Sequence, residues 1–254
     1  MSLPLYKFGG LRFWNEREIT ARERMTAQIV QEITTGLRGV NQGWAFERVD
    51  CPVIMPRSRM NPNYTDDDVF ALSAKIGDQE MVLRAETTDG SYLMAADILR
   101  NTNTKPPLCV WQLGQSFRRE TNDGASASRL RFNSFYQLEF QLVYAKSSGA
   151  DYAAILRTAL VPLVERMTGL KARLEPSDRT PSYADETIDI EVYLGLDEKG
   201  EEVWREIAST SRRKDFPHLP NYEEGGKREL TVFEIAFGAD RLVALLMDQE
   251  NAAK

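Results

Sequence analysis

Apolar residues recur with two different periods along this chain, and the two periods predict helices and strands respectively. From residue 15 to 38 they return every three to four positions, as at Met25 and Ile29, which is the period of an amphipathic helix that closes near Gly36 and Gly39. Three further helices are predicted at about 91–99, 151–168 and 241–247. Each helix therefore has one side to bury against the rest of the fold.

A period of two marks the strands, most clearly between residues 131 and 144. There Phe135, Gln137, Glu139 and Gln141 fall on one face, and the mostly aromatic or aliphatic residues between them fall on the other. The other strands are predicted at 44–56, 80–84, 108–112, 187–196 and 202–210, the last two as a hairpin. This order predicts an α+β fold in which a mixed, largely antiparallel sheet is flanked by helices.

Composition adds the expectation of one folded domain over residues 1–254, since 42% of the residues are hydrophobic and 28% are charged. The chain opens without a signal-peptide apolar stretch and has no run of about eighteen apolar residues, so we expect a cytoplasmic protein with no membrane partner. A net charge of -6 argues against binding a long stretch of nucleic acid, whereas a short contact with one end stays open. Cys51 and Cys109 are expected to be reduced core thiols, because the sequence offers only His218 to complete a zinc site.

Two segments place charged groups beside predicted strands. In Arg84-Ala-Glu-Thr-Thr-Asp-Gly-Ser, Glu86 follows a strand and precedes a helix; the alternative is that Thr87 and its neighbours only cap that helix. In residues 117–120, Phe-Arg-Arg-Glu, arginines precede the alternating strand, and a guanidinium is well matched to carboxylate and phosphate. A solvated charge run would explain the arginines but not Glu139 between two glutamines in so aromatic a strand.

Two later segments add oxygen ligands and another cation. Residues 204–216 offer Glu206 and Ser209 as ligands for a hard cation such as magnesium. Strict alternation would put these two on opposite faces, so a β-bulge between them is required; an ordinary surface strand is the alternative. Residues 233–242, Phe-Glu-Ile-Ala-Phe-Gly-Ala-Asp-Arg-Leu, bring a glycine close to Arg241, for which the alternative is a solvent-exposed helix start.

In this order the segments resemble the catalytic domain of class II aminoacyl-tRNA synthetases, most closely the glycyl branch, over nearly the whole chain. The first helix and the strand after it look like the family's first motif, which builds a dimer interface. Residues 117–120 with 131–141 look like its second motif, and 233–242 like its third. Arg84-Ala-Glu-Thr is similar to the glycyl Arg-Pro-Glu-Thr, whereas residues 206–211 look more like seryl-tRNA synthetase.

The resemblance implies a ligase that uses ATP and Mg²⁺ and forms an aminoacyl-adenylate. Arg118 would bind the α-phosphate and the amino-acid carboxylate, and Arg241 the γ-phosphate and the adenine ring, which makes these two the catalytic pair. Phe135 would stack on adenine, Arg131 would hold the γ-phosphate, and Glu120 would hold the adenine amine or the acceptor end. The ATP site would comprise Arg118, Glu120, Arg131, Phe135, Glu206, Ser209 and Arg241, with Glu206 and Ser209 holding the metal.

The resemblance also implies a site for the amino acid, in which acidic side chains grip the α-amino group. Its members would be Glu86, Arg118, Gln137, Glu139 and Glu234. Because attack of a carboxylate on a phosphate needs alignment and neutralised charge, no general base is required. A chain with one histidine is therefore still a credible catalyst.

The chain departs from the family pattern at three places. The glycyl Glu-Pro-Ser is Glu234-Ile-Ala236, so alanine and serine stay beside glycine as candidate substrates. The usual Arg-x-Arg is Arg131-Phe-Asn133, which removes one cation. Only thirteen residues (242–254) follow Arg241, so we expect no anticodon-binding domain.

Three functions stay open on the sequence alone. The favoured one is an enzyme that activates a small amino acid and passes it to an acceptor other than an anticodon-selected tRNA, such as a carrier. The second is a minimal tRNA synthetase that reads only the acceptor stem, with a basic surface of Arg119, Arg129, Arg212, Arg213 and Lys214. The third is a non-catalytic relative that serves as a dimeric binding or accessory subunit. We expect a homodimer.

Overall fold

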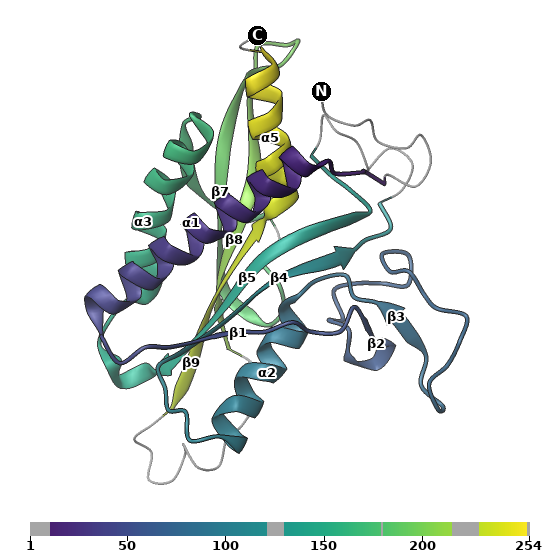
Figure 1. The fold of residues 1–254 in the computed structure, drawn as a ribbon, viewed down its shortest axis with the longest axis vertical. Coiled ribbons are helices and arrows are strands. Elements are labelled where there is room, and N and C mark those ends of the chain that lie inside the picture. Colours follow the sequence, from purple (N-terminus) through teal and green to yellow (C-terminus); the bar gives the residue numbers. More distant parts are fainter. Residues whose placement is uncertain (1–10, 121–129, 179, 215–228, 253–254) are drawn as a thin grey trace.

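A seven-stranded sheet forms the centre of the computed structural model, which describes residues 11–120, 130–178, 180–214 and 229–252 (Figure 1). The order of its strands is β1-β4-β5-β9-β8-β7-β6. The strands are β1 (Ala45–Arg48), β4 (Leu108–Phe117), β5 (Ser134–Ala145), β6 (Ala172–Pro176), β7 (Ala184–Leu196), β8 (Glu202–Arg213) and β9 (Leu230–Gly238). β1 runs parallel to β4 and the remaining neighbours are antiparallel, which confirms the predicted mixed, largely antiparallel sheet.

Helices lie on both faces of the sheet. They are α1 (Glu16–Val40), α2 (Thr88–Asn101), α3 (Tyr152–Thr168) and α5 (Ala239–Ala252), with short 3₁₀ helices η1 (Arg57–Arg59) and η2 (Lys146–Ser148). α1, α3 and α5 contact one another over one face, and α2 packs on β4 and β5 from the other (Figure 1). All four predicted helices are confirmed; among the described residues, none is long and apolar enough to cross a membrane.

Each face of the sheet has its own apolar core. On the three-helix side Ile29 and Ile33 of α1 cluster with Phe140 of β5 and Leu156 of α3, all at most 1% exposed. On the other side the buried residues of α2, among them Leu99, cluster with β4 and β9. The central strands are thus covered on both faces near α2, and the part of the sheet beyond α2 is left for polar residues.

The first predicted strand is split in two. β1 ends at Arg48, and β2 (Ile54–Pro56) pairs with β3 (Met81–Leu83) in a separate two-stranded sheet. Pro52 lies in the break, in agreement with its inability to donate to a ladder. β6 and β9 were not predicted. Two of the five residues of β6 are charged and it ends in proline, and β9 is apolar on both sides of Glu234 and so lacks a period of two.

Candidate active site

The polar face of β5 lies opposite the three-helix core, where a row of paired residues crosses the sheet. Across β4, β5, β9, β8 and β7 the row reads Gln112, Glu139, Ala236, Ser209 and Asp189. The neighbours of Glu139 along β5, Leu138 and Phe140, are in the helix-side core, so the predicted two-faced strand is confirmed. The row joins three of the segments that the sequence predicts to carry chemistry, through Glu139, Ala236 and Ser209.

Glu139 is completely buried at the centre of the site. Its carboxylate accepts hydrogen bonds from the hydroxyls of Thr87 at 2.5 Å and Thr88 at 3.0 Å, and from Gln141 Nε2 at 2.8 Å. Burial, followed by the charge of Glu234, raises the pKa of Glu139 well above its ordinary range. Thr87 is the N-cap of α2, but its hydroxyl makes no capping hydrogen bond, so the capping interpretation of this segment does not account for it.

A second row brings Glu234 of β9 between Gln141 of β5 and Ser211 of β8. Glu234 accepts from Gln141 Nε2 at 2.9 Å and from Arg213 Nη1 at 2.6 Å. Gln141 therefore bridges the carboxylates of Glu139 and Glu234.

Arg213 is a site residue that the sequence analysis assigned to a basic surface instead. It is only 8% exposed, and its guanidinium lies 4.2 Å from the ring centre of Tyr92 and 4.0 Å from that of Tyr183. Counting by twos along the strand from Ser209 would have placed Arg213 on the site face. Its ion pair with Glu234 confirms that placement.

Glu86 adds a third buried carboxylate. It is 8% exposed and accepts hydrogen bonds from Tyr64 Oη at 2.9 Å and Asn61 Nδ2 at 3.2 Å. Burial, followed by the charge of Glu234, raises its pKa. Asn61 and Tyr64 come from the segment between β2 and β3, where no sequence pattern pointed to a site.

Arg118 lies between this acidic group and the aromatic rim. Its Nε donates to the carbonyl of Ala85 at 3.0 Å, and its guanidinium lies 5.3 Å from the ring centre of Tyr64 and 5.2 Å from that of Phe135. Burial disfavours the cation, but the surrounding acidic groups, Glu86 among them, outweigh it and raise the pKa of Arg118. Arg118 is thus a fixed cation beside a carboxylate cluster.

Gln137 continues the polar face of β5 towards this rim. Its side-chain oxygen accepts a hydrogen bond from Ser116 Oγ at 2.6 Å. Opposite it on β4, a Cβ on Gly114 would lie 2.5 Å from the guanidinium of Arg84. Arg84 needs that room because it donates to three backbone carbonyls, those of Cys51, Pro52 and Gln115.

Asn133, which replaces an arginine of the family pattern, braces the second motif. Its backbone carbonyl accepts from Arg118 N at 3.0 Å and its side-chain oxygen from Glu120 N at 2.9 Å. Glu120 in turn pairs with the exposed Arg131 at 3.4 Å. Arg131 and Glu120 are therefore together at the rim, as expected for groups that meet a ligand from solvent.

Arg241 contacts the predicted metal ligand directly. Its Nε donates to the Leu130 carbonyl at 3.1 Å, and its Nη1 donates to the Glu206 carbonyl at 2.9 Å and lies 3.3 Å from the Glu206 carboxylate. A Cβ on Gly238 would lie 3.0 Å from Arg241 Cδ, so the glycine leaves the space in which the Arg241 side chain lies. Arg241 of the third motif thus contacts β8, the strand that carries the predicted metal ligands Glu206 and Ser209.

The predicted bulge between Glu206 and Ser209 is confirmed. Opposite Ile190 and Glu191 of β7, the β8 register skips Ile207. Ile207 and Ala208 are both buried in the helix-side core, which leaves Glu206 and Ser209 on the site face.

These oxygens fit magnesium only in part. Burial, followed by the charge of Glu206, raises the pKa of the neighbouring Asp189 to about 6. Within the described part of the chain, no group of three or more His, Cys, Asp or Glu side chains is arranged to hold a metal, and Cys51 and Cys109 are free buried thiols. A magnesium ion at Glu206 and Ser209 would therefore keep waters or phosphate oxygens as further ligands.

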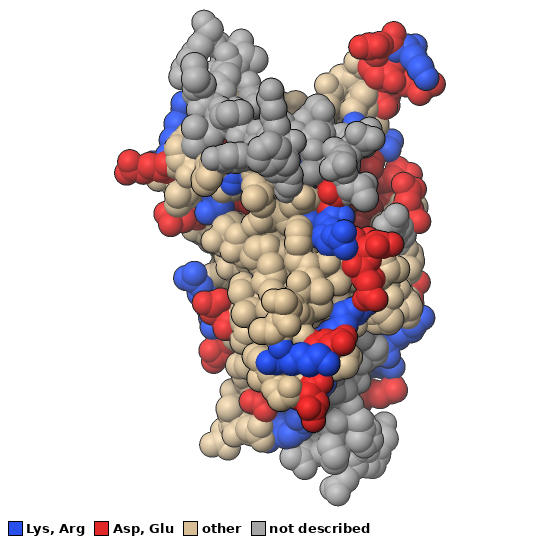
Figure 2. Space-filling model, turned by 90° about the vertical axis from the view of Figure 1, so that its right-hand side faces the viewer, with Lys and Arg blue, Asp and Glu red and all other residues tan. Residues whose placement is uncertain are grey.

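Arg212 and Arg213, two of the five residues of the predicted basic surface, lie on opposite faces of the sheet. Arg213 is buried in the site, whereas Arg212, the next residue along β8, points to the other face and pairs with Asp151 at 2.7 Å and Glu186 at 3.1 Å. Arg119 donates to the Asp66 carbonyl at 3.2 Å and Lys214 lies 3.5 Å from Asp185, both at exposed positions, and Arg129 lies outside the described residues, so for these three the surface stays a prediction. On the face drawn in Figure 2, the blue and red atoms are mixed around a broad tan area rather than gathered by sign.

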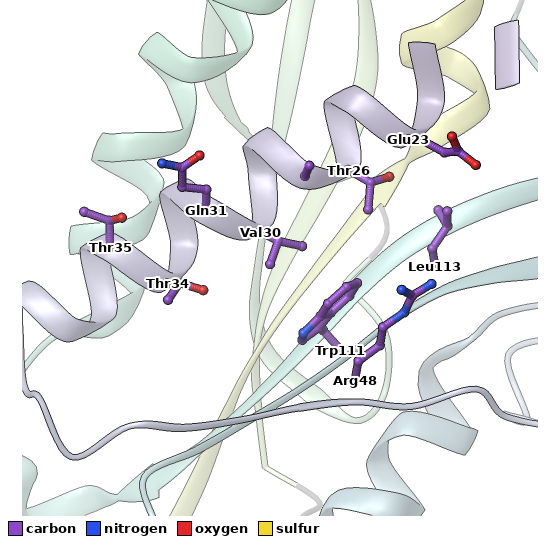
Figure 3. A pocket seen from close by; sticks show the side chains of 10 residues that line it. Glu23, Thr26, Val30, Gln31, Thr34, Thr35, Arg48, Trp111 and Leu113 are labelled. Carbon is purple, nitrogen blue, oxygen red and sulfur yellow. The ribbon is translucent and has the colours of Figure 1, made fainter. Parts of the chain in front are cut away.

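A hollow on the opposite side of the sheet is separate from this site. It has a volume of about 570 Å³ and lies between α1 and the strands β1 and β4 (Figure 3). Thr26 and Val30 of α1 face Trp111 of β4 and Arg48 of β1 across it. None of the sequence-predicted site residues lines it.

Comparison with known sequences identifies the family. The family model described as tRNA synthetases class II core domain (F) matches residues 23–252. A glycine–tRNA ligase of Cutibacterium acnes is 25% identical over 231 residues, which are 86% of this chain and 47% of that relative. A glycine–tRNA ligase of Mycolicibacterium paratuberculosis is 30% identical over 138 residues, 53% of this chain and 29% of that relative. The chain thus spans less than half the length of these curated relatives.

Solved structures with this fold are class II synthetases. Prolyl-tRNA synthetase from Cryptosporidium parvum, complexed with halofuginone and AMPPNP, has a TM-score of 0.70 at 13% identity and covers 95% of this chain and 48% of its own. M. kandleri SerRS in complex with A. aeolicus tRNASec has a TM-score of 0.69 at 17% identity and covers 96% of this chain and 54% of its own. These likenesses confirm the predicted fold class. Because the family model matches most of the chain, the chain belongs to the class II tRNA synthetase core-domain family.

Proposed function

We propose that this protein activates a small amino acid, with glycine favoured, by forming an aminoacyl-adenylate from ATP with Mg²⁺. The observation that carries the proposal is the buried group of Glu86, Glu139 and Glu234 beside the cation of Arg118. Arg213 pairs with Glu234, whereas Glu86 and Glu139 accept hydrogen bonds only from uncharged side chains within the described residues. Two such buried carboxylates are costly unless a further cation joins them, and the α-ammonium group of an amino acid is such a cation. Arg118 is placed to take the carboxylate of the same molecule.

The side chains around the acidic group favour a substrate with a small side chain. Arg213 is held between two tyrosines next to Glu234, so the space beside the acidic group is taken by rigid side chains. An apolar pocket discriminates one methylene by only about 1–3 kcal/mol, so steric exclusion of this kind is what glycine selectivity needs. Alanine and serine remain alternative substrates. Ala236 replaces the serine of the glycyl pattern and lies between Glu139 and Ser209, so the site lacks a hydroxyl that the glycyl pattern has.

ATP in this proposal lies along the rim. Phe135 stacks on adenine, Glu120 holds the adenine amine or the acceptor end, and Arg131 and Arg241 hold the γ-phosphate. Glu206 and Ser209 hold Mg²⁺, which would neutralise phosphate charge during attack of the amino-acid carboxylate. The contact of Arg241 with Glu206 supports this arrangement, because the two side chains lie side by side. When ATP and Mg²⁺ bind, Arg241 would pair with the γ-phosphate and Glu206 with the metal ion instead of with each other.

The proposal also covers the acceptor and the assembly. We propose an acceptor other than an anticodon-selected tRNA, such as a carrier or an isolated tRNA acceptor end. We also propose a homodimer through the face of α1 and β1. The hollow lined by Thr26, Val30 and Trp111 supports it as a surface that a second copy would fill.

Exchange of labelled pyrophosphate into ATP tests the activity directly. It is measured with Mg²⁺ and without RNA for glycine, alanine, serine, threonine and proline. Exchange with one amino acid supports adenylate formation and names the substrate. Exchange that appears only when tRNA is added points to the acceptor-stem enzyme, and none under either condition in a folded protein contradicts the proposal.

A further inference from the structure

Asp189 of β7 stands at the end of the polar row, directly opposite Ser209. It is 9% exposed, and its carboxylate accepts hydrogen bonds from the hydroxyls of Ser177 and Ser209. Its other oxygen, Oδ1, is buried and has no hydrogen-bond partner within the described residues. An unpaired oxygen of a buried carboxylate is costly, so its retention calls for a partner that the chain itself does not provide.

The neighbouring acidic residues are paired, which sets Asp189 apart. Glu191, two residues along the same strand, lies 2.8 Å from Arg173, and Glu206 lies 3.3 Å from Arg241. Among the described residues, no lysine or arginine forms an ion pair with Asp189. The charge of Asp189 therefore faces that of Glu206 with only hydroxyl donors to support it.

The substrate ammonium is too far away to be the missing partner. Asp189 on β7 and Glu139 on β5 are separated by β8 and β9. Three strand spacings of about 4.8 Å put the two residues roughly 14 Å apart. A cation that serves Asp189 must instead lie on the side of Ser209 and Glu206.

We propose that Asp189 is a positioning residue of the divalent-cation site formed by Glu206 and Ser209. By accepting the hydroxyl hydrogen of Ser209, one carboxylate oxygen turns the lone pairs of Ser209 Oγ towards the ion. The second oxygen, Oδ1, accepts a hydrogen bond from a water of the ion, and the carboxylate adds a negative charge beside that of Glu206. Oxygen-only surroundings suit a hard cation of the magnesium type. The inference rests on the proposed function, because the ion is that of the ATP site.

The test measures cation binding rather than turnover. Mn²⁺, a paramagnetic substitute for Mg²⁺, is titrated by electron paramagnetic resonance into the full chain saturated with a non-hydrolysable ATP analogue. We expect Asp189→Asn to weaken Mn²⁺ binding by about 10–100-fold, the usual effect of losing an outer-shell partner. The control Glu186→Gln, on the same strand but ion-paired with Arg157 and Arg212 on the opposite face, should bind Mn²⁺ as the unaltered protein does.

A second readout excludes a merely structural role. Since Asp189→Asn removes an unpaired buried charge, the melting temperature without ligands should stay the same or rise. If that variant fails to fold, Ser177→Ala, which frees the Asp189 side chain, should weaken Mn²⁺ binding in its place.

The outcomes separate this inference from the proposed function. Wild-type affinity for Mn²⁺ in Asp189→Asn, together with a loss in Glu206→Gln, overturns the role of Asp189 alone. Wild-type affinity in Glu206→Gln, or no binding by the unaltered protein, overturns the cation site of the proposed function and the inference with it. Weaker binding in both variants supports both.

Discussion

The two faces of β5 are equally buried and chemically opposite. Phe140 is 1% exposed and packs with the aliphatic residues of the three-helix side, whereas the adjacent Glu139 is 0% exposed and bound by two threonines and a glutamine. Burial of Phe140 stabilises the fold by removing apolar surface from water. Burial of Glu139 costs free energy, because it takes a carboxylate out of water next to Glu234. In β5, one face therefore stabilises the fold, and the other face lowers its stability but carries the polar residues of the candidate site.

The largest effect should come from the stabilising face. Phe140→Ala should lower the free energy of unfolding by about 3–5 kcal/mol, because it removes a buried aromatic ring and leaves a cavity. Guanidinium unfolding measures this change, and Glu139→Gln is the matched variant on the other face, for which the free energy of unfolding should stay or rise. A loss below about 1 kcal/mol for Phe140→Ala would contradict the comparison.

The next effect should fall on activity. Arg118→Ala should slow amino-acid-dependent pyrophosphate exchange by about a hundredfold to a thousandfold, by analogy with the loss of one transition-state donor. Arg212→Ala is the control, since Arg212 lies on the helix-side face and pairs with Asp151 and Glu186. Near-normal exchange in Arg118→Ala would exclude it from the site.

A smaller effect should follow from crowding the rim. In Gly238→Ala the new methyl group would lie 3.0 Å from Arg241 Cδ and displace that side chain. We expect about a tenfold loss in kcat/KM for ATP, below the roughly hundredfold that a 1 Å misplacement can cause. The KM for the amino acid should stay unchanged, and a change confined to that KM would show that Arg241 does not act on ATP.

The smallest effect concerns pH. The folded-state pKa values of Glu139 and Glu86 are raised by burial, so the folded chain holds these protons more tightly than the unfolded chain does. Their contribution to stability is fully present below about pH 4 and is lost as the pH rises through the raised values. The melting temperature without ligands should therefore fall as the pH rises from weakly acidic to alkaline. Glu139→Gln should flatten this slope without removing it, and an unchanged slope would mean that Glu139 is ionised throughout.

The candidate site was predictable from sequence where local periodicity decides it. Alternation predicted the polar face of β5, and the need for Glu206 and Ser209 to share a face predicted a bulge between them, which the structure has at Ile207. Alternation counted from Ser209 also puts Arg213 on the site face. The sequence analysis instead grouped Arg213 with Arg212 in one basic surface, because the two residues are adjacent in sequence. Successive residues of a strand point to opposite faces, which is why Arg212 and Arg213 do not share a surface.

Other parts of the site depended on long-range contacts. Asn61 and Tyr64 reach Glu86 from an irregular segment with no period to read. Asn133 stands where the family pattern has a charge, and only the folded chain shows that it braces Arg118 and Glu120. No local pattern reports such contacts, because they depend on how segments far apart in the chain come together.

The sequence by itself determined the helices, most of the strands and the two-faced character of β5, because each depends on the order of apolar and polar residues within a short segment. The tertiary structure decided which of the polar residues meet. It paired Arg213 with Glu234, placed Gln141 between Glu139 and Glu234, and set Asp189 opposite Ser209. Periodicity fixes the face on which a side chain lies, but its neighbours across the sheet follow from the strand register, which the packing of the two cores sets over the whole chain.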